Sequence, residues 1–453
     1  MNDLMQKIVS FSKRRGFIFP SSEIYGGAAG LWDYGPLGAL SKNNLKNLWL
    51  DTFVFQEQNI FLIEGTILMN SKVWQASGHI DNFTDALKEC RKCNLRFRAD
   101  HLEAGKFVGQ GKAKENNQCP GCGSKDFTEP KMFNLMFKTF LGPIEDKMHQ
   151  TYLRPETAQS MFTNFQNVSD SMRAKIPFGI AQLGKSFRNE ITLSDFTFRS
   201  REFDIAEIEF FIKKEDDEKW FDFWIDKLEK FYLDLGLEKK NLRRFEHPKD
   251  SLAHYSKRTV DIEYKFPFGW SELGGVANRM DYDLKKHEEF SGKNLKYFDS
   301  VKNENYHPYV IEPTMGIDRA LLALLVNGYQ EVENGRTKTT KSVKDKEVLL
   351  KIHRKIAPIK VAILPLVKNK PELTKKAKEV HKMLKAYFVC QYDEVGSIGR
   401  RYRRQDEIGT PFALTVDFES LKDEDVTIRD RDTMKQERIK IKDIVSLLTE
   451  KLK

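Results

Sequence analysis

The chain has 453 residues, and 75 Lys and Arg residues against 66 Asp and Glu residues give it a formal net charge of +9. At about 150 residues per domain, this length predicts two or three domains. A content of 40% hydrophobic and 31% charged residues excludes a largely disordered chain. No apolar run approaches the ~18 residues that cross a bilayer, and the amino terminus has no secretory apolar segment. We therefore expect a soluble cytoplasmic protein without a membrane partner, whose mild basic charge permits a polyanionic one.

Four of the five cysteines form two identical pairs, and this pattern predicts a metal site. Cys90 and Cys93 are separated by two residues, as are Cys119 and Cys122, so each pair can offer two thiolates to one ion from a tight turn. The 25 residues between the pairs slightly exceed the usual zinc-ribbon spacing. Structural Zn²⁺ is the favoured interpretation, and four reduced cysteines without a metal are the alternative. Cys390 lies in an apolar run and is interpreted as a small core residue.

The middle of the chain contains both helix and strand patterns. Leu153–Gln159 opens a predicted helix, with Pro155 in its favoured first-turn position. Residues 177–212 are rich in β-branched and aromatic residues that alternate with period two, which predicts an antiparallel hairpin. Residues 216–235 carry aromatic side chains at helical spacing, which predicts a helix packed against a core.

The predicted hairpin carries charge among its apolar residues. Residues of like parity project from one face of a strand. Two sets of residues in the hairpin have like parity: Arg188 and Glu190, and, further along the chain, Arg201, Phe203, Glu207 and Glu209. Because unpaired buried charge is costly, such a face is either solvated, with cross-strand ion pairs, or lines a polar site. The hairpin alone leaves both readings open.

A second segment favours the polar site. Residues 311–319 lead into an apolar helix, and Gly316 permits close approach of the backbone. Arg319 enters the first turn of that helix, where the helix dipole disfavours a cation. An arginine in this position is easier to explain if it binds an anion such as a phosphate.

A domain boundary is predicted near residues 331–357, a highly charged segment that is followed by Pro358. Strand patterns follow at 359–366, 388–392 and 412–416, with a helix opened by Pro371 and a closing helix at 441–452. This alternation predicts a small α/β domain.

The ordered motifs of the chain resemble one known family. Phe187–Glu190 followed by Phe198–Phe203 resembles motif 2 of class II aminoacyl-tRNA synthetases, Gly316–Arg319 resembles motif 3, and Asp33–Gly38 resembles motif 1. Further segments are similar to the dimeric glycyl-tRNA synthetases: Tyr152–Gln159, Val73–Asp85, Met132–Pro143 and Glu272–Gly275. The resemblance runs from about residue 10 to the C-terminus.

The resemblance implies an α+β fold with two domains. Residues 1–350 would form the class II antiparallel-sheet catalytic domain, with insertions at about 86–130 and about 213–305, and residues 355–453 the C-terminal α/β anticodon-binding domain. It also implies a homodimer, with Pro36 at the subunit interface. The implied activity is that of a ligase that activates glycine with ATP, with release of pyrophosphate, and transfers glycine to the 3′ end of tRNA(Gly).

Roles for single residues follow from the same resemblance. Arg188 is implied to hold the α-phosphate of ATP and Arg319 the γ-phosphate, with Glu272 suited to the Mg²⁺ that accompanies ATP. Phe203 is implied to stack on adenine. The implied ATP-binding set is Arg188, Asn189, Glu190, Phe198, Arg199, Ser200, Arg201, Glu202, Phe203, Glu272, Leu273, Gly316, Ile317, Asp318 and Arg319.

Glycine has no side chain to grip, so a site can read its ammonium group with carboxylates and exclude a Cβ by crowding. The implied glycine-binding set is Arg98, Glu156, Phe203, Asp204, Ile205, Ala206, Glu207, Glu312, Pro313, Thr314, Met315 and Gly316, with the three glutamates as ammonium readers. Two departures weaken the correspondence. Residues 204–206 differ from the usual family sequence, and Thr314 stands where the family usually has Ser, which adds a methyl group.

The anticodon-binding domain contains a basic stretch at 399–404. Its Arg400, Arg401, Arg403 and Arg404 surround Tyr402, which predicts tRNA binding through stacking and phosphate contacts, with a solvated helix face as the alternative.

Two other functions are alternatives to the ligase. A non-catalytic binding protein on this scaffold, such as a synthetase-like accessory subunit of a DNA polymerase, would have no reason to keep Arg188, Glu190, Glu272 and Arg319 together. A synthetase for threonine, proline or histidine is disfavoured, because the threonyl and prolyl enzymes usually have Thr at the position of Glu156.

Overall fold

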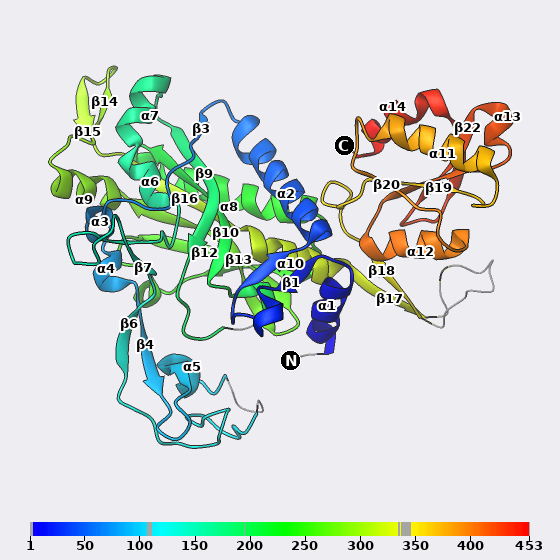
Figure 1. Ribbon diagram of the computed structural model, residues 1–453. Coiled ribbons are helices and arrows are strands. Elements are labelled where there is room, and N and C mark those ends of the chain that lie inside the picture. The colour runs from blue at the N-terminus through cyan, green and yellow to red at the C-terminus, as the bar shows by residue number, and fades with distance from the viewer. Residues whose placement is uncertain (1–2, 107–110, 194, 334–335, 337–345, 453) are drawn as a thin grey trace.

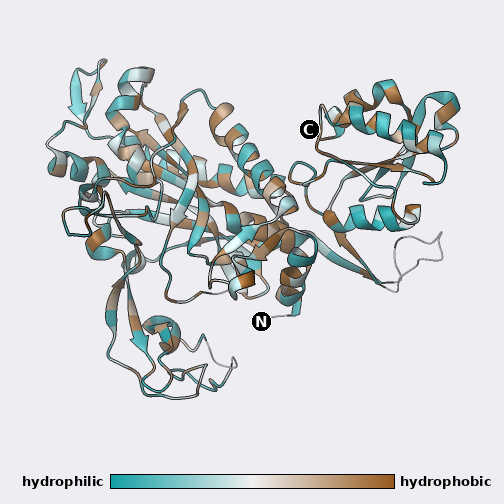
Figure 2. Cartoon of the chain, viewed as in Figure 1, coloured by the Kyte–Doolittle hydropathy of each residue, from teal (hydrophilic) through white to brown (hydrophobic). Residues whose placement is uncertain are grey.

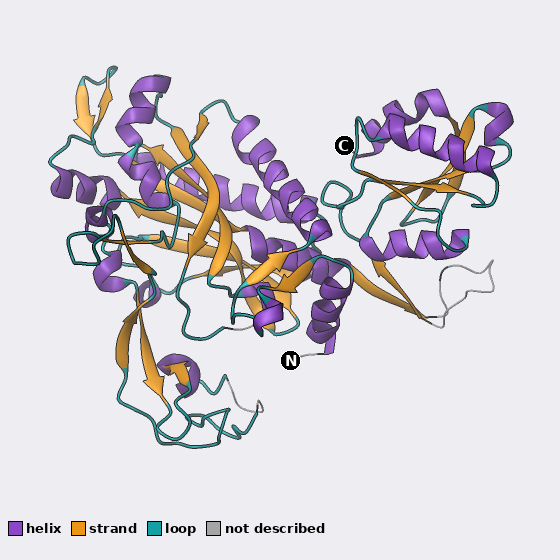
Figure 3. Ribbon diagram, in the orientation of Figure 1, coloured by secondary structure: helices purple, strands orange, loops and turns teal. Residues whose placement is uncertain are grey.

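The computed structural model describes residues 3–106, 111–193, 195–333, 336 and 346–452. The chain forms a large unit around a seven-stranded sheet and a C-terminal unit around a five-stranded sheet (Figure 1). Helices and strands are mixed in both units (Figure 3). The predicted combination of an antiparallel catalytic sheet with a C-terminal α/β domain is confirmed. In the described part of the chain, no helix combines the length and apolar character required to cross a bilayer.

The central sheet positions the site. Its neighbouring strands are antiparallel except for β3 and β9. Their order is β11 (Leu242–Glu246), β12 (Arg258–Phe266), β13 (Gly269–Met280), β16 (Tyr309–Gly316), β10 (Glu202–Ile212), β9 (Phe178–Phe187) and β3 (Ile60–Leu62).

The predicted hairpin is confirmed as β9 and β10, and β16 pairs with the other edge of β10. Glu207 lies opposite Gln182 on β9 and opposite Thr314 on β16. On the far side of β16, Ala277 of β13 lies opposite Glu312. The register therefore brings three segments that are distant in sequence to one region of the sheet.

The second predicted insertion, about 213–305, is wrong for the part that contains β11, β12 and β13. These strands are integral to the central sheet, and β13 pairs directly with the motif 3 strand β16. The segment also contains α8 (Asp217–Asp234), which confirms the helix expected at 216–235. Pairing between strands some forty residues apart leaves no local pattern, which is why the sequence did not reveal it.

The main hydrophobic core lies between the sheet and its covering helices. The aromatic face of α8 is buried through Phe221, Trp224 and Phe231, and α10 (Ile317–Gly328) is apolar on nearly all sides because it lies inside this core. Burying one such large side chain stabilises the fold by ~1.5–3 kcal/mol. The helix α2 (Pro36–Leu50) begins at its proline and packs against α10.

Smaller elements surround this unit. The two cysteine pairs belong to a projecting lobe formed by β4 (Thr84–Glu89), β5 (Arg96–Arg98), α5 (Ala99–Glu103) and β6 (Lys131–Asn134) (Figure 1). The remaining elements are α1 (Asp3–Arg14), β1 (Ile18–Pro20), β2 (Trp32–Tyr34), α3 (Ser71–Ala76), α4 (His79–Asn82), β7 (Lys138–Phe140), β8 (Gln150–Tyr152), α6 (Ala158–Thr163), α7 (Phe165–Met172), α9 (Tyr282–Ser291), β14 (Tyr297–Asp299) and β15 (Glu304–Tyr306).

The segment near the predicted boundary is more ordered than a simple linker. It forms a hairpin of β17 (Tyr329–Glu333) and β18 (Lys346–Leu350), and β18 contacts the C-terminal unit through α12 (Ile398–Ile408). Of the residues between these strands, only 336 is described. The charged sequence is therefore in part a structural connection between the two units.

The C-terminal unit has its own core. Its strand order is β20 (Cys390–Tyr392), β19 (Val361–Pro365), β21 (Phe412–Val416), β22 (Asp425–Asp430) and β23 (Gln436–Lys440), with helices α11 (Pro371–Leu384), α12, α13 (Ser420–Asp423) and α14 (Ile444–Leu452). The predicted strands and both predicted helices are confirmed. Cys390 is half-buried and packs against this core, and burial raises the pKa of its thiol to about 11.

Candidate active site

A cleft of about 340 Å³ opens where β10, β13 and β16 meet the segment that follows β9. It unites most of the predicted ATP and glycine residues. Those that line it are Glu156, Arg188, Glu190, Phe198, Arg199, Ser200, Phe203, Asp204, Ile205, Glu207, Glu272, Glu312, Thr314, Gly316, Asp318 and Arg319. Four of the six residues on the charged face of the hairpin therefore line a polar cleft, namely Arg188, Glu190, Phe203 and Glu207, whereas Arg201 and Glu209 do not.

Arg188 enters this cleft as a cation available to a ligand. Its Nε donates to the carbonyl oxygen of Pro155 at 3.1 Å, and its guanidinium lies 5.3 Å from the ring centre of Phe203. Within the described ranges, no carboxylate lies at ion-pair distance from it. The ring centre of Phe83 lies at a similar distance, 5.4 Å. A guanidinium held by one carbonyl oxygen and two rings keeps several N–H donors for an anion.

Arg319 lies in the first turn of α10, as predicted, and is held from two sides. Its Nε donates to the carbonyl oxygen of Phe198 at 3.2 Å, and one terminal nitrogen donates to Glu272 Oε2 at 2.8 Å. Burial would raise the pKa of Glu272, but Arg319 outweighs it and lowers that pKa. Arg319 and Glu272, two of the three predicted catalytic groups, are thus in direct contact.

Two glutamates form one wall of the cleft at its acidic end. The backbone N–H of Thr157 donates to Glu207 Oε2 at 2.7 Å, and the Thr157 hydroxyl donates to the same oxygen. Gln159 donates to Glu156 Oε1 at 2.9 Å, and His79 Nε2 lies 3.2 Å from its other oxygen. These bonds fix the orientation of both carboxylates.

The third glutamate is held by Arg279, which is only 1% exposed. Arg279 donates to Glu312 Oε1 at 2.9 Å and makes two bonds to Asp283, at 2.8 and 2.9 Å. Its guanidinium also lies 4.0 Å from the ring centre of Tyr255. Arg279 therefore orients Glu312 from behind the cleft.

The acidic end is electrostatically incomplete. Burial would raise the pKa of Glu156, but His79 and Arg279 hold it well below its usual range. Burial and the nearby charge of Glu156 raise the pKa of Glu207. Burial raises the pKa of Glu312 to about 8, because Glu207 and Glu156 oppose the effect of Arg279. A cation bound among them would favour the ionised form of all three.

Several predicted site residues lie outside the cleft lining. Ala206, Leu273, Met315 and Ile317 point into the main core, and Pro313 is buried, so any contact of theirs with a ligand would involve the backbone. Three polar side chains have other partners: Arg98 pairs with Asp85 and Asp100, Arg201 donates to the carbonyl oxygen of Ala29, and Glu202 pairs with Lys185. The backbone N–H of Asn189 donates to the carbonyl oxygen of Leu135. Asp204 lines the cleft, but its carboxylate is bonded to Lys42 and Lys46.

The sequence reasoning missed one wall of the cleft. This wall comprises Thr197, His247, Ser251, Leu252, Ala253, Tyr255, Thr259, Asp261, Gly275, Val276 and Ala277. Most of these residues lie in the segment assigned to an insertion. Arg279 was missed as well, because a single arginine is ordinarily solvated and its partner Glu312 is 33 residues away in the sequence.

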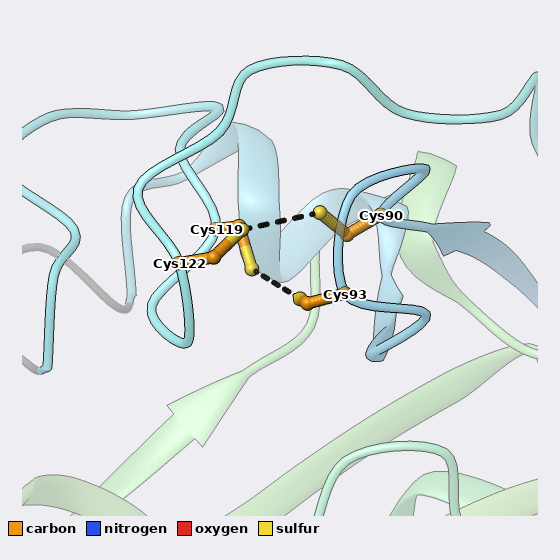
Figure 4. A group of neighbouring side chains, drawn as sticks. All are labelled: Cys90, Cys93, Cys119 and Cys122. Atoms are coloured by element: carbon orange, nitrogen blue, oxygen red, sulfur yellow. Dashed lines mark hydrogen bonds between the residues drawn. The ribbon is translucent and has the colours of Figure 1, made fainter.

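The four predicted metal-ligating cysteines meet in the projecting lobe. Their sulfur atoms all lie within 4.8 Å of one another, with Cys90 to Cys122 at 3.6 Å and Cys93 to Cys119 at 3.5 Å (Figure 4). A tetrahedral zinc site with Zn–S bonds of about 2.3 Å has sulfurs about 3.8 Å apart. The four side chains therefore fit a single metal ion.

The predicted tRNA-binding arginines have different environments on α12, which is largely hydrophilic (Figure 2). The prediction that Arg401 contacts RNA is wrong, because this residue is only 1% exposed and donates to the carbonyl oxygens of Pro365 and Leu366. Arg403 pairs with Glu347 at 3.5 Å and Arg404 with Asp393 at 2.5 Å. Arg400 is exposed. The helical repeat turns only part of this stretch towards solvent.

Comparison with known proteins identifies the family. Residues 137–328 match the tRNA synthetase class II core domain (G, H, P, S and T), and residues 360–451 match the anticodon binding domain. Glycine–tRNA ligase of Clostridium acetobutylicum is 51% identical over 468 residues, with 99% of each chain covered. The chain belongs to the glycine–tRNA ligase family.

Other relatives agree. Glycine–tRNA ligase of Thermobifida fusca is 49% identical and covers 100% of this chain and 98% of its own, and that of Streptomyces coelicolor is 50% identical with 99% of each covered. A crystal structure of prolyl-tRNA synthetase from Cryptosporidium parvum, complexed with halofuginone and AMPPNP, has a TM-score of 0.65 and 15% identity, covering 99% of this chain and 77% of that one. At this identity the likeness concerns the fold alone.

Proposed function

We propose that this protein activates glycine with ATP to give glycyl-adenylate and pyrophosphate, and then transfers glycine to the 3′ end of tRNA(Gly). The observation that carries the proposal is the cleft itself, in which two arginines, Arg188 and Arg319, face three oriented glutamates. One end suits a polyphosphate and the other a small ammonium compound, and membership of the glycine–tRNA ligase family joins the two in one reaction.

In the first step, the glycine carboxylate attacks the α-phosphorus of ATP and pyrophosphate leaves. Arg188 would stabilise the charge that develops on the α-phosphate and Arg319 that on the γ-phosphate, while Phe203 stacks on adenine. Class II synthetases use ATP with Mg²⁺, and the carboxylate of Glu272, which lines the cleft, is the residue suited to hold this ion. The bound ion would neutralise phosphate charge.

The acidic end would select glycine. Glu156, Glu207 and Glu312 would bind its ammonium group, which offers three N–H donors. Thr314, opposite Glu207 on the neighbouring strand, would crowd the position of a Cβ. Alanine differs from glycine by one methyl group, so exclusion has to come from shape.

Glycine-dependent exchange of pyrophosphate into ATP, measured across a panel of amino acids, tests this assignment. We expect exchange with glycine, and a loss on the order of 3–4 kcal/mol of transition-state stabilisation in Arg188→Ala and in Arg319→Ala. A matched control is Arg243→Ala, which removes an exposed arginine on β11 that pairs with Glu263 outside the cleft. Undiminished exchange in both cleft variants would reject the site.

We also propose that the four cysteines hold a structural Zn²⁺. A site closed by four thiolates leaves no open coordination position, so the ion would stabilise the lobe and take no part in catalysis. The protein is further proposed to be a cytoplasmic homodimer with α2, which begins at Pro36, at the interface. Sedimentation as a 52.8 kDa monomer at micromolar concentration would contradict the dimer.

Residues 1–350 are proposed as the catalytic domain and 355–453 as the domain that reads the anticodon, in line with the anticodon-binding match over 360–451. Within that domain, Arg400 and Arg404 are the members of the basic stretch proposed to contact tRNA.

A further inference from the structure

A buried lysine connects the two chain segments that carry the proposed ATP contacts. Lys42 of α2 has a side chain only 7% exposed, and its Nζ lies 2.5 Å from Asp204 Oδ2 and 2.5 Å from Asp318 Oδ1. Asp204 follows motif 2 residue Phe203 on β10, and Asp318 precedes motif 3 residue Arg319 on α10. One ammonium group thus joins two buried carboxylates that are 114 residues apart.

Further bonds complete this bridge. Asp318 Oδ2 accepts the backbone N–H of Asp204 at 2.6 Å, and Asp318 Oδ1 also accepts the hydroxyl of Tyr34, whose ring centre lies 4.0 Å from Lys42 Nζ. Burial would raise the pKa of Asp204, but Lys42 and Lys46 lower it to about 2. All four carboxylate oxygens of Asp204 and Asp318 therefore have a hydrogen-bond or ion-pair partner, which fixes the backbone of β10 against the first turn of α10.

The side chains next in sequence to the bridge face the cleft. Phe203 and Arg319 both line it, and each lies one residue from a bridged aspartate. In the proposed function, these two side chains hold opposite ends of ATP, the adenine and the γ-phosphate. A change of about 1 Å in their separation is enough to misalign a bound substrate. The glutamates at the acidic end have other supports, namely Thr157, Gln159 and Arg279.

We propose that Lys42 is a positioning residue for ATP, and that its bridge between Asp204 and Asp318 sets the distance between Phe203 and Arg319. This inference rests on the proposed function. A buried ion pair is often no more stabilising than apolar residues of the same size, so its value here lies in the geometry that it specifies.

Lys46 provides a matched control on the same helix. It lies one turn further along α2 and donates to Asp204 Oδ1 at 2.8 Å, but its side chain is more exposed, at 23%. Within the described part of the chain, Lys46 forms no bond to Asp318. Lys42→Met and Lys46→Met therefore both remove a positive charge beside Asp204, and only the first breaks the bridge to Asp318.

The test is glycine-dependent pyrophosphate exchange by the full-length protein, with ATP and glycine varied separately. We expect Lys42→Met to raise the KM for ATP at least tenfold while the KM for glycine stays within twofold, and Lys46→Met to stay within twofold for both. Tyr34→Phe, which removes one donor to Asp318 with little change in volume, should raise the KM for ATP by about two- to fivefold. General loosening of the fold would change both constants together and would overturn the proposal, as would equal effects in the two lysine variants.

Binding of ATP with Mg²⁺, measured by calorimetry, separates this inference from the proposed function. If the wild-type protein shows no pyrophosphate exchange with any amino acid, the proposed function is rejected. Weaker ATP binding in Lys42→Met than in Lys46→Met would still support the bridge, and equal binding would overturn it. If Lys42→Met does not fold, Tyr34→Phe decides by the same two measurements, and an unchanged affinity for ATP then refutes the proposal.

Discussion

Replacing Arg279 by Met is predicted to be among the most destabilising single changes in the catalytic unit. Methionine keeps an apolar side chain, but it removes the guanidinium that lies against the rings of Phe162 and Tyr255, with its charge and three hydrogen bonds. Asp283 and Glu312 then remain buried beside one another without their cation. Removing one partner from a buried ionic network costs ~3–5 kcal/mol.

Urea unfolding followed by tryptophan fluorescence measures this loss, because Trp224 lies in the core of the same unit. With a slope m of about 3 kcal/mol/M, the midpoint of the catalytic transition should fall by roughly 1–1.7 M. The control is Arg243→Met, which breaks an ion pair between Arg243 and Glu263 on the same sheet. Because the Arg243 side chain is 45% exposed, its loss should cost less than ~1 kcal/mol. Midpoints that differ by less than ~0.3 M between the two variants would refute the reasoning.

Three further predictions concern other parts of the molecule. Glu209 is fully buried, both its carboxylate oxygens lack hydrogen-bond partners among the described residues, and burial, with Glu312 nearby, raises its pKa well above the usual 4.5. Because the folded state keeps a proton that the unfolded chain has lost, the free energy of unfolding should fall above pH 4.5, by up to ~1.4 kcal/mol per pH unit from this group. Glu209→Gln should lack that slope, and identical pH profiles for the two proteins would contradict it. Purified protein should contain about one zinc ion per chain, and Cys119→Ser should lower this content; metal analysis near zero on reduced protein would reject the zinc site. The double variant Arg400→Ala/Arg404→Ala should keep pyrophosphate exchange and bind tRNA more weakly, and the slope of log affinity against log salt should be shallower by roughly 0.7–0.9 per lost phosphate contact. Arg401→Ala should instead lower the stability of the protein. Unaffected tRNA charging in the double variant would assign anticodon reading to other residues.

The local sequence pattern was sufficient to predict those helices and strands whose buried residues recur at the spacing of a helix or a strand. The hairpin of β9 and β10, the aromatic helix α8 and the helix that opens at Pro371 all appear where alternation or helical spacing placed them. The motifs likewise indicated the cleft, because Arg188, Glu207, Glu272 and Arg319 do line it. In these cases, the residues that make up the pattern or the motif are close together in the sequence, so the pattern could be recognised without the fold.

The sequence was insufficient wherever a residue's partner is distant along the chain. Arg401 belongs to a stretch that reads as a basic surface, yet the turn of α12 directs it to carbonyl oxygens of Pro365 and Leu366. The strands β11–β13 were read as an insertion, although β13 pairs with β16. Only tertiary packing decides such pairings. A buried charged group or backbone polar group needs a partner, and the fold determines which partner lies close enough.

The side chains that hold the site residues in place also have partners that are distant along the chain. Neither Lys42 nor Arg279 stands out in the sequence, since a single lysine or arginine is ordinarily solvated. The sequence indicated many of the side chains that face the cleft, through motifs whose residues are close together in the chain. The tertiary structure alone decided what holds them in place, because Lys42 meets Asp318 and Arg279 meets Glu312 only after the sheet and its covering helices have assembled.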